Sequence, residues 1–139
     1  MTSPYPTQRF ADHGKDGMQG DCWRTCIAGL TGQPRDDVPH FVQMYADDKS
    51  LFWWNATVEY VEQHVDEATL VCLEPTFPVY IAPSPWPVVI ATGPSPRGDL
   101  LHAVLVDATT GDLVWDPHPS RAGLAGPPTE LAALDWKTL

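Results

Sequence analysis

Prolines recur along this chain and limit its fold more than any other feature. There are 15 of them among 139 residues, about twice the usual share of ~5%. A proline inside a helix removes a backbone hydrogen bond and clashes with the preceding turn. Long-helix bundles and coiled coils are therefore excluded, and the helices have to be short. The length and the hydrophobic share of 43% suit one compact core.

The charge balance is acidic, with 8 basic against 18 acidic residues, so 8 − 18 = −10. Sequence-independent binding to nucleic acid or to anionic membranes needs a surplus of Lys and Arg. No stretch approaches the ~18 consecutive apolar residues of a membrane span, and the first residues (MTSPYP) do not resemble a signal peptide. We therefore expect no nucleic-acid partner, no membrane and a cytoplasmic location. The oligomeric state stays open.

The first half of the chain predicts helices behind a polar N-terminal arm or ordered loop over residues 1–20. Asp21 is a good helix cap, and Gly32 with Pro34 would end the first helix. Asn55 is the expected cap of the third helix. Apolar residues at helical spacing place the three helices over residues 22–30, 36–47 and 55–65.

The second half has the short β-branched runs of strands. The clearest local signal is a β-hairpin, in which a turn over residues 108–111 joins His102–Asp107 to Asp112–Asp116. A short helix is expected near Glu130–Leu134. We predict an α+β fold for residues 1–139 as one domain, with N-terminal helices packed on a small antiparallel sheet. Two further strands are expected at Thr69–Leu73 and Val88–Ala91.

Three residues could together carry chemistry. Cys22 lies at a predicted helix N-terminus, where the dipole and the unpaired N–H groups favour a thiolate. His102 begins one hairpin strand and Asp116 ends the other. A turn centred near Thr109 and Thr110 would make them cross-strand neighbours. These are the nucleophile, base and orienting carboxylate that a cysteine hydrolase needs.

The other cysteines favour plainer interpretations. Cys26 lies one turn inside the first helix and Cys72 within an apolar strand, so both are expected to be small buried hydrophobes. Three cysteines, an odd number, disfavour a disulfide framework. A zinc site remains an alternative, in which Cys22 and Cys26 bind the metal with histidines drawn from His13, His40, His102 and His118.

Several blocks of the chain follow a known pattern. Gly20–Leu30 (GDCWRTCIAGL) and Gln33–Phe41 (QPRDDVPHF) resemble the N-terminal signature of the small papain-like cysteine peptidases of bacteria and their phages. Gly93–Gly98, His102–Val104 and Val114–Pro119 (VWDPHP) resemble the histidine and aspartate blocks of the same peptidases. The resemblance covers roughly residues 19–41 and 93–124, somewhat over a third of the chain. The order Cys, His, Asp also resembles that of bacteriocin-leader peptidases, as do the Asp-Cys and Asp-Pro pairs.

The resemblance implies a papain-like fold and a role for each matching residue. Cys22 would be the nucleophile, His102 the general base and acid, and Asp116 the orienting group. Papain-like enzymes also use a glutamine, usually six residues before the cysteine, in the oxyanion hole. That position is Asp16, which cannot donate when ionised. Gln19 is the expected replacement, with Gln8 as an alternative if the N-terminal segment folds back. Because Gln19 also lies seven residues before Cys26, Cys26 remains a less favoured candidate for the nucleophile.

The function expected from this pattern is that of a thiol hydrolase, a cysteine peptidase or amidase working through an acyl-enzyme thioester without a cofactor or metal. Its partner would be a peptide or another amide. Trp23, Ser95 and Arg97 are the predicted substrate contacts, Arg97 for a substrate carboxylate. The alternatives are a deamidase or transglutaminase-like acyl transferase with the same triad, a catalytically silent papain-like binding module, and a structural zinc domain.

Overall fold

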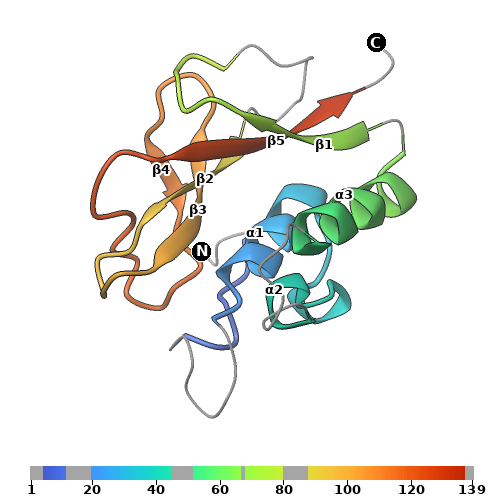
Figure 1. Cartoon of the computed structure of the whole chain (residues 1–139), viewed down its shortest axis with the longest axis horizontal. Coiled ribbons are helices and arrows are strands. Elements are labelled where there is room, and N and C mark those ends of the chain that lie inside the picture. The colour runs from blue at the N-terminus through green and yellow to red at the C-terminus, as the bar shows by residue number, and fades with distance from the viewer. Residues whose placement is uncertain (1–4, 12–19, 45–51, 67, 80–87, 137–139) are drawn as a thin grey trace.

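The structure is a computed structural model of the chain that describes residues 5–11, 20–44, 52–66, 68–79 and 88–136. Helices come first and strands follow, so the predicted α+β class is confirmed (Figure 1). The helical elements are α1 (Cys22–Thr31), a 3-10 turn η2 (Arg35–Asp37), α2 (Phe41–Met44) and α3 (Phe52–His64). The strands are β1 (Ala68–Leu73), β2 (Val88–Pro94), β3 (Leu101–Asp107), β4 (Leu113–Trp115) and β5 (Glu130–Trp136).

The five strands form one sheet in the order β1-β5-β2-β3-β4, and every neighbouring pair is antiparallel. The last strand thus lies between β1 and β2. The helices pack against one face of this sheet (Figure 1). Consecutive residues of the central strands point to opposite faces, so each strand contributes to two separate apolar layers.

Both layers are well filled. On the helix side, Ile90, Leu105 and Leu134 pack with Ile27 of α1 and Val61 of α3. On the opposite side, the strand residues alternate with these and pack against the segment that follows β1, in a cluster of Val89, Ala91, Val104, Val106, Leu131 and Ala133 with Phe77 and Val79. Because both faces are buried, the central strands have apolar residues at successive positions.

The prediction of a helix near Glu130–Leu134 is wrong, because this segment is strand β5. The sequence Leu131-Ala132-Ala133-Leu134 is rich in helix-forming residues. All four side chains are nonetheless buried, alternately in the two layers. Pairing with β1 and β2 on both sides overrides the local preference, since a central strand buried on both faces lacks the usual polar alternation.

The predicted helices are confirmed to different degrees. The first ends as expected, with Gly32 in the left-handed conformation (φ 74°). The second is wrong as a continuous helix, because Pro39 separates η2 from α2; its expected end at Asp47 lies outside the described residues. The third is confirmed, but it begins at Phe52, so Asn55 is inside the helix and does not cap it.

Asp21 precedes α1 but its side chain does not cap the helix. The carboxylate is fully buried and accepts hydrogen bonds from the backbone N–H groups of Arg9 (3.1 Å) and Phe10 (2.7 Å). It also forms an ion pair with Arg24, whose Nε lies 3.0 Å away. Asp21 therefore fixes the N-terminal segment, residues 5–10, beside the start of α1. The described part of the predicted arm is an ordered loop.

We expect Asp21→Asn to lower the free energy of unfolding by about 3 kcal/mol, because the buried Arg24 guanidinium loses its buried counter-charge and keeps only a longer contact with an exposed carboxylate. Urea denaturation would measure the loss. Asp36→Asn is the matched control, since Asp36 lies 3.8 Å from the same arginine but its side chain is 59% exposed. The free energy of unfolding should fall far less in Asp36→Asn than in Asp21→Asn. Equal losses for the two variants would contradict this account.

Candidate functional site

Cys22 is the first residue of α1 and its side chain is half-buried. The backbone N–H of Thr25 is the first to bond within the helix, to the carbonyl oxygen of Asp21 at 3.1 Å. The N–H groups before it have no acceptor within the helix. A thiolate or an oxyanion at this helix end would be stabilised by those N–H groups and by the helix dipole.

Close packing brings the start of α1 to strand β3. Toward the other end of the helix, Gly29 lets α1 pack closely, because a Cβ at that position would lie 3.1 Å from Leu105 Cδ1 of β3 and 3.0 Å from Tyr5 Cδ1. At the start of α1, Cys22 lies against His102, the second residue of β3, and their side chains form a hydrogen bond. The helix and the sheet thus meet at the two side chains that the sequence analysis expected to react together.

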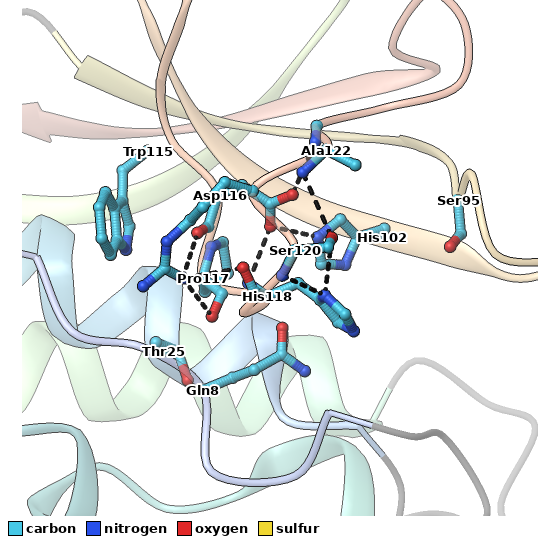
Figure 2. A network of polar contacts seen from close by, with 12 residues as sticks. Gln8, Thr25, Ser95, His102, Trp115, Asp116, Pro117, His118, Ser120 and Ala122 are labelled. Carbon is cyan, nitrogen blue, oxygen red and sulfur yellow. Dashed lines mark hydrogen bonds and ion pairs between the residues drawn. The ribbon is translucent and has the colours of Figure 1, made fainter.

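His102 and Asp116 form the shortest link of the site. The imidazole Nε2 lies 2.7 Å from Asp116 Oδ1, and both side chains are almost completely buried (Figure 2). Because Nε2 is used by the carboxylate, Nδ1 is the ring nitrogen left for the thiol. The predicted contact between His102 and Asp116 is confirmed.

The register that led to this prediction is wrong. Leu105 pairs with Trp115 and Val106 with Leu113, so Val114 is an extra residue in a β-bulge. Asp116 follows the end of β4 and is not a cross-strand partner of His102. Its carboxylate reaches the imidazole because the chain turns immediately after β4. A bulge shifts the register by one residue, which the turn sequence alone does not reveal.

Asp116 is buried as a carboxylate with three hydrogen-bond donors. Oδ1 accepts from His102 and from the backbone N–H of His118 (2.8 Å), and Oδ2 accepts from that of Gly123 (2.7 Å). Burial raises the pKa of this carboxyl, but the three hydrogen bonds outweigh it and the pKa is lowered overall. The group therefore stays ionised at neutral pH.

Burial and hydrogen bonding also act against each other on the pKa of the His102 imidazole, and here the overall result is a raised pKa. Burial lowers the pKa of His102, but its hydrogen bonds to Asp116 and Cys22 and the electrostatic contributions of those two groups raise it from 6.5 to about 9. His102 is therefore protonated at neutral pH. The site holds a positive imidazolium between a thiol and a buried carboxylate.

The other two cysteines differ from each other. Cys26 is buried, as predicted, and burial raises its pKa well above the ordinary value, with the charges of Cys22 and Asp116 adding to the effect. The prediction of a buried Cys72 is wrong. This residue lies near the end of the edge strand β1, where its exposed thiol is 3.8 Å from Glu130. Burial of part of the side chain and the Glu130 charge raise its pKa.

The remaining predicted site residues are not all brought together. Gln19 lies outside the described residues. Trp23 is only 6% exposed and packs edge-on against Trp53, so the expectation that it contacts substrate is wrong: its large ring fills the core beneath α1. Ser95 and Arg97 lie in the β2–β3 loop, just before His102. The Arg97 guanidinium extends to the loop after β4 and donates to Ser120 Oγ (3.2 Å).

Sequence reasoning gave no part in the Cys–His–Asp site to several residues that surround the pair (Figure 2), although it named His118 as a possible zinc ligand. His118 is buried and its ring lies edge-on to that of His102, with centroids 6.2 Å apart. The backbone N–H of Ser120 donates to His118 Nδ1 (3.0 Å), so this nitrogen is an acceptor. Arg121 binds the carbonyl oxygens of the same turn. The Asp-Pro-His-Pro motif was a signal for His118, whereas Arg121 has no local signal.

The zinc alternative gains no support from the described residues, among which no three His, Cys, Asp or Glu side chains are grouped to hold a metal ion. His13, one of the candidates, lies outside them. Within the same part of the chain, no helix is long and apolar enough to cross a membrane. The chain matches no protein-family model, no curated protein and no solved structure.

The raised pKa of His102 predicts how stability depends on pH. A pKa raised in the folded state stabilises the protein fully below the ordinary value of 6.5, and this stabilisation is lost as the pH rises through about 9. The difference in free energy of unfolding between wild type and His102→Gln should therefore shrink over that range. Urea titrations at several pH values would measure it, with His64→Gln on the exposed side of α3 as control. A difference that stays constant or grows would contradict the prediction.

Proposed function

We propose that the protein is a thiol hydrolase, a peptidase or amidase with a papain-like arrangement of helix and sheet. The observation that supports this most is the linear set formed by Cys22, His102 and Asp116. The thiol is hydrogen-bonded to the imidazole, and the imidazole to a buried ionised carboxylate. A nucleophile, a base and an orienting group are the three parts that covalent catalysis by cysteine requires.

The reaction begins from an ion pair. With the proton on His102, Cys22 is the thiolate, which attacks the carbonyl carbon of an amide and forms a carbon–sulfur bond. The carbonyl π electrons move to oxygen and give a tetrahedral oxyanion. When this collapses, the carbon–nitrogen bond breaks and His102 gives its proton to the departing amine. An acyl-enzyme thioester remains, with neutral His102 still oriented by Asp116.

Hydrolysis of the thioester reverses these roles. His102 takes a proton from water while the oxygen of that water attacks the acyl carbon. The carbon–sulfur bond then breaks, a carboxylic acid leaves, and the thiolate–imidazolium pair is restored. Asp116 keeps the ring oriented and stabilises its positive charge in both steps. No external oxidant or reductant is needed.

The oxyanion requires donors close to the attacked carbon. The free backbone N–H of Cys22 at the helix start supplies one. Gln19 remains the proposed second donor. Gln8 is a weaker choice, because its Nε2 already donates to the carbonyl oxygen of Phe10 (2.7 Å) and its backbone N–H to that of Pro117 (2.9 Å).

The β2–β3 loop is the proposed substrate side of the site, with Ser95 and Arg97. Arg97 is exposed, and among the described residues it forms no ion pair; its guanidinium donates only to the neutral Ser120 hydroxyl. In a chain with 18 acidic residues, such a cation in the loop that leads to His102 suits a substrate that carries a carboxylate.

Limited alkylation with iodoacetamide tests the nucleophile. At about pH 6, where an ordinary thiol is almost fully protonated, we expect Cys22 to react faster than either of the other two cysteines. Cys72 is the internal control because it is exposed yet has a raised pKa, and buried Cys26 should stay unlabelled. The His102→Ala variant should show at least tenfold slower alkylation of Cys22. Peptide mass spectrometry would measure the labelling of each cysteine. If Cys22 labels no faster than Cys72, the thiol hydrolase proposal fails.

A charged and a neutral reagent test Arg97. Iodoacetate carries a carboxylate where iodoacetamide carries an amide, so the ratio of their rates at Cys22 reports attraction of an anion. We expect Arg97→Gln to lower this ratio about threefold. Arg35→Gln removes the same charge elsewhere, from a guanidinium bound to Asp36, and should leave the ratio nearly unchanged. Equal effects of the two variants would show that only net charge matters.

A further inference from the structure

Arg121 closes the turn that carries Asp116. Its Nη1 donates to the carbonyl oxygens of three successive residues, Asp116 (3.0 Å), Pro117 (3.2 Å) and His118 (2.8 Å). The guanidinium also lies over the ring of Trp115, 4.0 Å from its centroid. Four consecutive residues at the end of β4, drawn together in Figure 2, thus contact this one side chain.

The backbone of Arg121 is itself unusual. Its φ is 55°, and it is the one residue other than glycine with a positive φ in the described part of the chain. The left-handed conformation is unfavourable for a residue with a Cβ. Such strain persists where the surrounding contacts fix the conformation, and it is frequent at functional sites. Here the contacts that fix it are those of the guanidinium with the turn.

A second set of contacts runs from the same turn toward Cys22. Nη2 of Arg121 donates to Thr7 Oγ1 (2.6 Å), and the backbone N–H of Gln8 donates to the carbonyl oxygen of Pro117. The N-terminal segment then continues to Phe10, whose N–H is bound by Asp21, the residue before Cys22. Arg121 therefore joins the sheet half of the site to its helix half.

We propose that Arg121 is a positioning residue, which holds the turn over residues 116–118 in the shape that aims the Asp116 carboxylate at His102. With the three carbonyl oxygens gathered on the guanidinium, the N–H of His118 is left facing the carboxylate. The inference deepens the proposed function, because Arg121 touches no substrate and acts through Asp116.

The titration of His102 separates positioning from simple charge. The groups that face this imidazole are Asp116 from the turn, Cys22 from α1 and the edge of the His118 ring. Removing a nearby cation would by itself raise the pKa of His102, because one positive charge no longer opposes another. Loss of the aligned carboxylate would lower it. The two explanations therefore predict shifts of opposite sign.

We would measure the His102 titration by NMR in wild type and in Arg121→Gly. Glycine adopts the left-handed conformation readily, so this change removes the guanidinium without adding backbone strain. We expect the pKa of His102 to fall from about 9 toward 6.5. Arg35→Ala is the matched control, since its Nη1 donates to the carbonyl oxygen of Thr7 (2.7 Å) and holds the same segment without touching the turn. It should leave the titration unchanged.

An unchanged or raised pKa in Arg121→Gly, even with lower thermal stability, would overturn the proposal. If that variant does not fold, Arg121→Lys keeps the charge but loses the planar fork; it should also lower the pKa, and a value as high as in wild type would overturn it. Slow labelling of Cys22 in wild type would refute the hydrolase function alone. Fast Cys22 labelling that Arg121→Gly leaves unchanged would refute only the role of Arg121.

Discussion

The Asp116 carboxylate is buried as an anion, and its charge has to be met by hydrogen bonds. Burying an unpaired carboxylate is costly in free energy. Three donors meet this need, from His102, His118 and Gly123. They come from strand β3 and from two points of the loop after β4, so the loop has to fold around the carboxylate. The same bonds leave the imidazole protonated and facing Cys22, which gives the site its chemical character.

On the helix side of the site, Asp21 is a second buried carboxylate whose charge is met by hydrogen bonds. It is buried beside Cys22 and binds Arg24 together with the backbone of the N-terminal segment. That segment also contacts the turn after Asp116. Two buried carboxylates thus hold the two halves of the site, and the segment between them connects the halves. Small shifts of α1 against β3 would separate the thiol from the imidazole.

What the sequence could predict follows from how local the signals are. Gly32 ends α1 through its own backbone preference, and the hairpin turn brings His102 close to Asp116. The end of the helix and the His102–Asp116 contact could therefore both be predicted from the sequence. The β-bulge at Val114 and the pairing of β5 depend on contacts with distant strands. The burial of Trp23 likewise depends on a distant element, helix α3, because the indole N–H of Trp23 donates a hydrogen bond to Thr57 Oγ1 of that helix. These features had no local signal.

The central proposal is that Cys22 and His102 exist as a thiolate–imidazolium pair. The ultraviolet absorbance of the thiolate, followed as a function of pH in wild type, Cys22→Ser and His102→Ala, tests it most directly. We predict one thiolate's absorbance in wild type already at about pH 6, below the range in which free thiols ionise, and its loss in both variants. Absorbance that develops only in alkaline solution, and equally in wild type and His102→Ala, would contradict the pair.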